Sequence, residues 1–218
     1  MFLVIGGTVG IGKSTVSYLL EKKLKEIKGE ESTILEPEPV VGSPYLKKYY
    51  EDPVKWTLVA QLDFLLLRHK QLLDCQEKLS VPGSKLKYMV FDRHLLEDYI
   101  FANMHSTKKN MRTFNSLAYH AIYNNILSIE KNSKVDYFFL LKAPLDMVIN
   151  RVKERGREIE MDVDVKYWQD LYDMYYNTPW VTEHFKEESK KLINIDATKS
   201  PEEIVDDIIK ILKKDNVI

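Results

Sequence analysis

The feature that most constrains the fold is the segment 6–15, GGTVGIGKST. Its residues Gly7, Gly12, Lys13 and Ser14 match the pattern G-x-x-x-x-G-K-[ST] in full, between the apolar run FLVI and the run VSYLL. Such a loop follows a strand and opens a helix, because glycine N–H groups and the positive helix end together hold phosphate oxygens. The motif predicts a strand–loop–helix unit that binds a nucleoside triphosphate, most simply ATP. The loop residues expected at the phosphates are Gly7, Thr8, Val9, Gly10, Ile11, Gly12, Lys13, Ser14 and Thr15.

Five short apolar runs alternate with helical patterns, which is typical of a parallel α/β sheet. The expected strands cover positions 2–6, 32–36, 87–92, 136–142 and 191–196. The expected helices lie after Ser14, over about 54–79, 111–131 and 164–176, from Pro144, and from Ser200 to the C-terminal region. Because the runs are nearly all apolar, the strands should be covered on both faces. We therefore expect one domain over residues 1–218, an α/β fold of the P-loop NTPase type with a five-stranded parallel sheet.

Composition restricts the partners of this chain. The 218 residues carry 32 basic and 33 acidic side chains, a formal net charge of −1. This balance gives no indication of nucleic-acid or membrane binding. The single cysteine, Cys75, lies in an apolar helical run and is expected in the core. No apolar run approaches ~20 residues, so we expect a cytoplasmic protein without a membrane partner.

Charged residues follow the second and third predicted strands. The segment EPEPV places Glu36 and Glu38 after one strand, and FDRHLLED places Asp92 and Arg93 after the next. Carboxyl ends of parallel strands meet at the ligand-binding edge of such sheets. A carboxylate there could accept the proton of an attacking hydroxyl, an acid could help hold Mg²⁺, and an arginine could stabilise phosphate charge. This edge is therefore the expected site of phosphoryl transfer.

Two helical segments add to this site. The segment NRVKERGRE brings Arg151, Arg155 and Arg157 together around a glycine, as expected for an arginine-rich lid that closes on phosphates. On the helix 54–79, Gln61 and Arg68 share a face with apolar residues at helical spacing. Buried there, they need polar partners or a pocket, because unpaired burial costs about 1–3 kcal/mol or more. The alternative is that both lie at the rim of that face.

These motifs, in this order, resemble the deoxynucleoside kinase family. The resemblance is carried by GGTVGIGKST, EPEPV, YYEDPVKWTLVAQ, FDRHLLEDYIFA and RVKERGREIE, and covers essentially the whole chain. The spelling FDRHLLED is most similar to the bacterial deoxyadenosine/deoxyguanosine branch. The resemblance implies ATP-dependent phosphorylation of a deoxyribonucleoside 5′-hydroxyl, with Mg²⁺ as cofactor. It also implies a homodimer, packed through the long helices near 57–79 and 112–130.

The resemblance assigns catalytic and phosphate-binding roles. Glu38 would be the general base, Arg93 would orient it, and Asp92 would help place Mg²⁺ with Ser14. The residues implied on the ATP side beyond the loop are Arg151, Arg155, Arg157 and Asp196.

The same resemblance assigns the nucleoside site. Tyr50 and Glu160 would bind the sugar 3′-hydroxyl, and Gln61 would contact the nucleobase. Arg68 and Asp98 would form a second polar layer around the base, a pattern similar to the purine and deoxycytidine enzymes. The implied order of preference is deoxyadenosine, then deoxyguanosine, then deoxycytidine.

Two other functions share part of this pattern. A thymidylate or other nucleoside-monophosphate kinase also has the P-loop, a Glu-Pro turn and an Asp-Arg pair, but it needs additional cations for the acceptor phosphate and no base at Glu38. A nucleotide-dependent switch would bind a partner and transfer no phosphate to a small molecule. The Pro-Glu-Pro-Val spelling and the Gln61–Arg68 face favour the nucleoside kinase.

Overall fold

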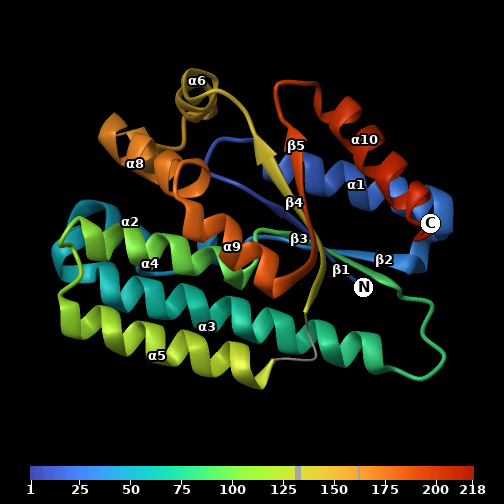
Figure 1. Cartoon of the computed structure of the whole chain (residues 1–218), viewed down its shortest axis with the longest axis horizontal. Coiled ribbons are helices and arrows are strands. Elements are labelled where there is room, and N and C mark those ends of the chain that lie inside the picture. The colour runs from blue at the N-terminus through green and yellow to red at the C-terminus, as the bar shows by residue number, and fades with distance from the viewer. Residues whose placement is uncertain (131–133, 162) are drawn as a thin grey trace.

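A five-stranded parallel sheet forms the centre of the molecule (Figure 1). The computed structural model describes residues 1–130, 134–161 and 163–218. The strand order is β2-β3-β1-β4-β5, and each neighbouring pair is parallel. The strands are β1 (Phe2–Gly6), β2 (Thr33–Glu36), β3 (Tyr88–Asp92), β4 (Val135–Lys142) and β5 (Ser189–Asp196). The predicted fold class and the positions of all five strands are confirmed.

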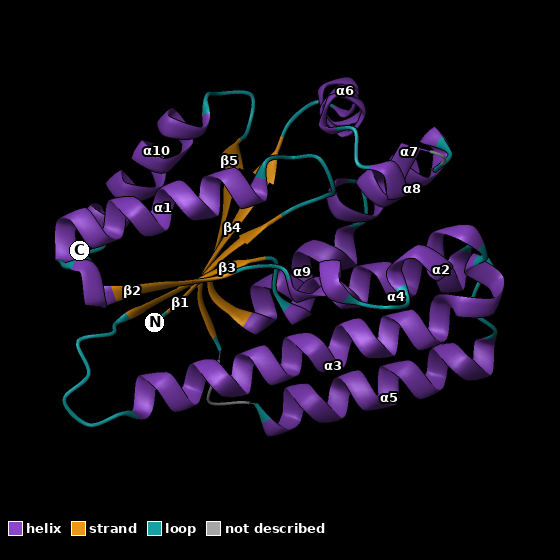
Figure 2. Cartoon of the chain, turned by 180° about the vertical axis from the view of Figure 1, so that it is seen from behind, coloured by secondary structure: helices purple, strands orange, loops and turns teal. Residues whose placement is uncertain are grey.

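Helices cover both faces of the sheet, as predicted. Leu3 and Ile5 pack into a core with α1 (Lys13–Lys28) and α10 (Pro201–Lys214), whereas Phe2 and Val4 face the other core. That second core contains α3 (Pro53–Ser80), α4 (Asp98–Thr107) and α5 (Thr113–Ile129), and Figure 2 shows the two layers on opposite sides of the strands. Successive side chains along a strand point to opposite faces of the sheet. Because helices cover both faces here, the residues on both faces are apolar, which explains the continuous apolar runs. Cys75 is fully buried in this second core.

The helices predicted from periodicity are present, but several short ones were missed. The predictions near 54–79, 164–176 and Pro144 correspond to α3, α8 (Val165–Tyr176) and α6 (Leu145–Arg155), and the Ser200–Glu203 capping box starts α10. The prediction over 111–131 corresponds to α5, and its last position lies outside the described residues. The missed helices are α2 (Leu46–Glu51), α4, α7 (Glu158–Met161) and α9 (Pro179–Glu188). Few turns give too little periodicity to identify a helix. Within the described part of the chain, no helix is long and apolar enough to cross a membrane.

Three strands deliver the charged residues to one edge. β1 leads into the loop 7–12, β2 leads to Glu38 through Pro37, and β3 leads directly to Arg93. The short 3₁₀ turn η2 (Pro39–Gly42) follows β2, and η3 (Leu95–Glu97) follows β3. A third such turn, η1 (Glu30–Ser32), precedes β2. The carboxyl edge of β1, β2 and β3 therefore carries the residues that the sequence had suggested for the chemistry.

Candidate active site

A cavity of about 230 Å³ lies at the carboxyl edge of the sheet. Its wall includes the P-loop, Glu38, Arg93, one face of α3 and the arginines around α6. The predicted site residues that line it are Val9, Gly10, Gly12, Lys13, Ser14, Thr15, Glu38, Tyr50, Gln61, Arg68, Arg93, Asp98, Arg151, Arg155, Arg157 and Glu160. The lining also contains side chains that the sequence motifs did not predict, namely Val40, Leu46, Tyr49, Phe64, Phe101 and Tyr167. The structure thus gathers most of the predicted residues around one space.

The P-loop has the backbone that its glycines suggest, with one difference. Gly10 and Gly12 have φ values of 81° and 104°, a region that favours glycine, and a Cβ at Gly10 would lie 2.5 Å from Val152. However, the Gly7 N–H donates to Glu97 Oε1 at 2.9 Å and the Thr8 N–H donates to the Tyr176 hydroxyl at 3.2 Å. These two N–H groups are therefore held by protein acceptors and do not turn toward a phosphate, in contrast to the simple expectation.

Lys13 is a buried cation at the start of α1. Its Nζ donates to the Thr8 carbonyl at 3.0 Å, and its side chain is 6% exposed. Burial, together with the charge of Arg93, lowers the pKa of Lys13 to about 8, although Glu38 and other acids oppose this fall. A bound phosphate would therefore stabilise the charge of Lys13, because the anion would replace the water that the buried ammonium group has lost.

Glu38 lies between two buried arginines. Its Oε1 accepts a hydrogen bond from Arg68 Nη2 at 2.8 Å and forms an ion pair with Arg93 Nε at 2.8 Å. Burial raises the pKa of Glu38, but Arg93, Arg68 and Lys13 together outweigh it and lower the pKa to about 2. Glu38 is therefore ionised at neutral pH, as a proton acceptor must be.

The other glutamate of EPEPV does not share this position. Glu36 forms an ion pair with Lys78 at 2.8 Å, and its second oxygen lies 3.4 Å from the amide of Gln71. Both partners lie on α3, and neither is part of the cavity lining. The structure therefore distinguishes Glu38 from Glu36, which the strand-end pattern alone could not.

The end of the cavity at α3 contains polar atoms that lack partners. Arg68 contacts Asp98 closely, and both side chains are buried, as is Gln61. Within the described residues, Gln61 Oε1, Arg68 Nε and Asp98 Oδ2 have no hydrogen-bond partner. Burial raises the pKa of Asp98 to about 7, against the opposing charges of Arg68 and Arg93. Since Gln61 and Arg68 are 1% and 4% exposed, the rim alternative is wrong.

Aromatic side chains enclose the same region. Tyr49 packs against Phe64 edge to face, with ring centroids 6.2 Å apart, and its hydroxyl lies 2.7 Å from that of Tyr167. Phe101 lies under the Arg93 guanidinium at 5.0 Å. Apolar walls with unpaired donors and acceptors at their base suit a flat, polar, heteroaromatic ligand. Tyr49 in YYEDP and Phe101 just after FDRHLLED are the sequence signal that could have identified part of this wall.

The arginines of the lid already have partners. Arg151 donates to the Ile11 carbonyl at 3.2 Å and to the Ala197 carbonyl at 3.1 Å. Glu160 forms ion pairs with Arg155 at 2.5 Å and with Arg157 at 3.6 Å. The lid segment therefore brings residues predicted for the sugar side and the phosphate side into contact.

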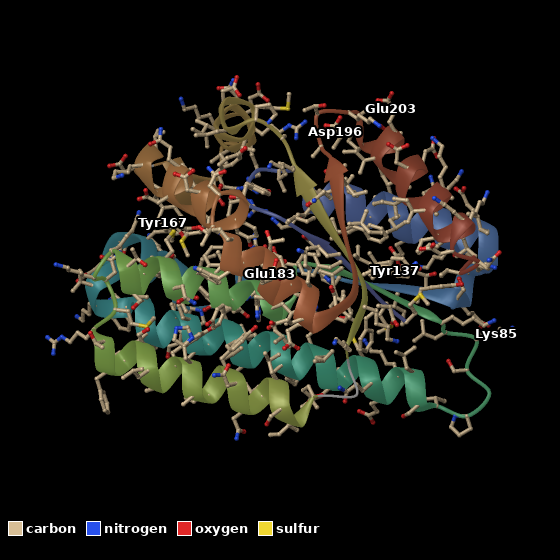
Figure 3. All side chains as sticks on the ribbon, viewed as in Figure 1. Lys85, Tyr137, Tyr167, Glu183, Asp196 and Glu203 are labelled. Atoms are coloured by element: carbon tan, nitrogen blue, oxygen red, sulfur yellow. The ribbon has the colours of Figure 1, made fainter. Side chains whose placement is uncertain are left out.

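Some predicted residues lie outside the cavity lining. Ile11 and Asp92 are buried, with exposed fractions of 1% and 5%, and neither lines the cavity. Asp196 lies at the end of β5, where its carboxylate accepts from the Thr198 N–H and hydroxyl, and it borders a separate hollow. Figure 3 shows Asp196 well away from Tyr167, which lines the cavity. The structure therefore does not bring Asp196 to the main cavity.

Of the two residues predicted to hold Mg²⁺ beside bound phosphates, Ser14 lines the cavity and Asp92 does not. The Ser14 side chain is exposed at the cavity, and Asp92 Oδ1 is buried with no hydrogen-bond partner among the described residues. In the part of the chain that the structure describes, no group of three or more histidine, cysteine or acidic side chains could hold a metal ion. Mg²⁺ commonly takes one or two protein oxygens together with phosphate and water, so a large protein cluster is not needed.

The comparisons with known proteins agree with this geometry. The model of the deoxynucleoside kinase family matches residues 3–214. The chain belongs to the deoxynucleoside kinase family. As a member it is a kinase with a nucleotide phosphate donor and a nucleoside acceptor.

Named relatives include deoxynucleoside kinases of two bacteria. The chain is 31% identical over 181 residues to the deoxyadenosine/deoxycytidine kinase of Bacillus subtilis, covering 83% of this chain and 76% of that protein. It is 25% identical to the deoxyguanosine kinase of the same organism, covering 80% and 76%. The deoxyadenosine kinase from M. mycoides with bound dATP superimposes with a TM-score of 0.80 at 29% identity, over 98% of this chain and 100% of that one. The family resemblance read from the motifs is confirmed.

Proposed function

We propose that this kinase transfers the γ-phosphoryl group of ATP to the 5′-hydroxyl of a deoxyribonucleoside, with Glu38 as the general base. The observation that supports this most is the position of Glu38 within one cavity, between the P-loop and the unpaired polar atoms of Gln61, Arg68 and Asp98. An acceptor whose base occupies the α3 end would extend its sugar toward Glu38. We also propose that residues 1–218 act as one catalytic domain.

In this proposal separate groups of residues bind the phosphates, the metal ion and the sugar. The P-loop and Lys13 bind the ATP phosphates, and Arg151, Arg155 and Arg157 close on the transferred group. Arg93 stabilises charge on that group and orients Glu38. Bound beside Ser14 and Asp92, Mg²⁺ would neutralise charge on the phosphate oxygens. Tyr50 and Glu160 fix the 3′-hydroxyl once Glu160 leaves its lid arginines.

The low pKa of Glu38 defines its role. A carboxylate with a pKa of about 2 is a weak base, so it takes the proton late and chiefly orients the hydroxyl. Phosphoryl transfer tolerates this because its loose transition state needs positioning and charge stabilisation more than early deprotonation. Glu38 therefore acts mainly by alignment, with proton removal completing the step.

We propose deoxyadenosine as the preferred acceptor, followed by deoxyguanosine and deoxycytidine. Asp98 and Gln61 can accept hydrogen bonds from an exocyclic amine, which adenine, guanine and cytosine all carry. The relatives support this order in part: the Bacillus protein is named for deoxyadenosine and deoxycytidine, and the M. mycoides enzyme has structures with dATP and with dCTP.

We further propose a cytoplasmic homodimer. The two long helices α3 and α5 lie side by side in Figures 1 and 2 and carry exposed apolar side chains. They include Leu66, Leu73, Phe114, Leu117, Ile122 and Ile129. A second copy that covers them would remove this apolar area from water.

The test is a side-by-side phosphorylation assay with ATP and Mg²⁺. The acceptors are deoxyadenosine, deoxyguanosine, deoxycytidine, thymidine and thymidine monophosphate. The proposal expects the 5′-monophosphate of a nucleoside as product, with deoxyadenosine fastest. Activity on the monophosphate alone would mean that the site accepts a phosphate, and a thymidine rate above the other three would overturn the assignment of Asp98.

A further inference from the structure

Glu97 is a fully buried carboxylate that the chemistry above does not use. It ends the turn η3 directly before α4, its side chain is 0% exposed, and the lining of the cavity as described does not include it. A buried charge is destabilising unless it is paired and hydrogen-bonded, so its partners indicate what it does.

Its partners come from three separate segments. Oε1 accepts from the Gly7 N–H at 2.9 Å and from the Tyr175 hydroxyl at 2.8 Å, and lies 3.4 Å from Arg93 Nη1. Oε2 accepts from the His94 N–H at 3.2 Å. One carboxylate thus connects the start of the P-loop, the strand end that carries Arg93, and α8.

Two of these partners have a positive φ, which glycine adopts readily but which is strained for any other residue. Gly7 has a φ of 139°, and Arg93, which is not glycine, has a φ of 70°. Strained conformations persist only where neighbouring groups determine them. The Arg93 guanidinium is held from one side by Glu38 and from the other by Glu97 and Tyr175, whose hydroxyl accepts from Nη1 at 2.5 Å.

We propose that Glu97 is a positioning residue, which ties the P-loop and the Arg93 guanidinium to one carboxylate and so fixes the phosphate donor relative to Glu38. The inference rests on the proposed function, in which Arg93 and Glu38 act on the transferred group. Donor and acceptor then stay aligned without a direct contact from Glu97. Tyr175 extends this frame to α8, the helix that follows the lid.

The variant Glu97→Gln tests this with little change in shape. All four partners of Glu97 are donors. A glutamine has one acceptor oxygen and one NH₂ group, so whichever way it turns, its NH₂ group opposes a donor that Glu97 would have accepted from. It also removes the charge that faces Arg93. Since misplacement by about 1 Å can reduce rates about 100-fold, we expect kcat to fall by roughly 10- to 100-fold. KM for ATP and for the nucleoside should change by less than about threefold, because neither contacts Glu97.

Asp136→Asn is the matched control. Asp136 Oδ2 accepts the Phe2 N–H at 2.7 Å at the opposite end of β1, and Oδ1 pairs with Lys190 at 2.7 Å. Each variant neutralises a carboxylate that faces a cation and accepts a backbone N–H at one end of β1. Asp136→Asn should lower the thermal midpoint and leave kcat unchanged.

An NMR measurement separates positioning from activity. In the wild type the Arg93 Nε–H signal should exchange slowly with water, and Glu97→Gln should accelerate that exchange and shift the Gly7 amide signal, whereas Asp136→Asn should change neither. If Glu97→Gln keeps kcat within about twofold, or raises both KM values at constant kcat, the proposal is overturned. If the wild type phosphorylates no deoxynucleoside, the proposed function fails. The NMR comparison still tests the positioning role in that case: Arg93 and Gly7 signals that are unchanged in Glu97→Gln would refute it, and altered signals would support it.

Discussion

Arg68 bridges Asp98 and Glu38, and its removal should lower the free energy of unfolding by leaving Asp98 without a cation. Asp98 is 1% exposed and Arg68 is 4% exposed, so Arg68→Met leaves a buried carboxylate without its cation. Breaking a buried pair in this way costs about 3–5 kcal/mol of unfolding free energy. Asp98→Asn leaves Arg68 with Glu38 and should cost about 1–3 kcal/mol. Because the double variant has no uncompensated carboxylate at position 98, it should be less destabilised than the sum of the single variants by about 2 kcal/mol.

The sign of the pH dependence follows from Asp98. Its pKa is raised to about 7, so the folded protein retains a proton that the unfolded chain releases between about pH 4 and 7. Removing Arg68 raises this pKa further, and the loss in Arg68→Met should therefore be larger near pH 8 than near pH 5.5.

Urea unfolding of the four proteins at both pH values measures these terms. The more exposed pair Glu36–Lys78 provides a control, because Glu36→Gln with Lys78→Met should show a coupling below about 1 kcal/mol. Additive losses at Arg68 and Asp98, within about 0.5 kcal/mol, or a pH-independent loss in Arg68→Met, would show that the two side chains do not form a coupled buried pair.

Three further predictions concern the phosphate side and the outer helices. Because the pKa of Lys13 is about 8, kcat/KM for ATP should fall as pH rises above that value, and a profile flat to about pH 9.5 would contradict the assignment. Asp92→Asn should raise the Mg²⁺ concentration for half-maximal activity by about tenfold, and an unchanged requirement would exclude Asp92 from the ion site. Phe114→Glu combined with Leu117→Glu should convert the proposed dimer to a monomer in sedimentation, since these side chains are 80% and 64% exposed, and a wild type that sediments as a monomer would rule the interface out.

Much of this site could be predicted because its signals are local. The P-loop depends on residues adjacent in sequence, and the face shared by Gln61 and Arg68 follows from helical spacing within α3. The strands were identified because both of their faces are buried, which makes their sequences apolar throughout.

Contacts between distant segments could not be predicted in the same way. Glu36 and Glu38 have the same chemistry in sequence, and it is side chains of α3, 30 or more residues away, that separate them. Lys78 and Gln71 bind Glu36 outside the cavity lining, whereas Arg68 binds Glu38 within it. The Gly7 N–H was expected to face a phosphate, yet it donates to Glu97, 90 residues later. Such choices depend on tertiary packing, and no periodicity records them.

The role of Glu38 as the base is tested most directly by a single-turnover comparison of Glu38→Gln with Glu36→Gln. The two glutamates lie in the same proline-framed segment, but Glu38 lies between Arg68 and Arg93 whereas Glu36 pairs with Lys78. With ATP, Mg²⁺ and deoxyadenosine, Glu38→Gln should reduce the transfer rate by at least about 100-fold with its fold intact, while Glu36→Gln should stay within about threefold of wild type. Equal rates for Glu38→Gln and the wild type, or a larger loss in Glu36→Gln, would contradict Glu38 as the base.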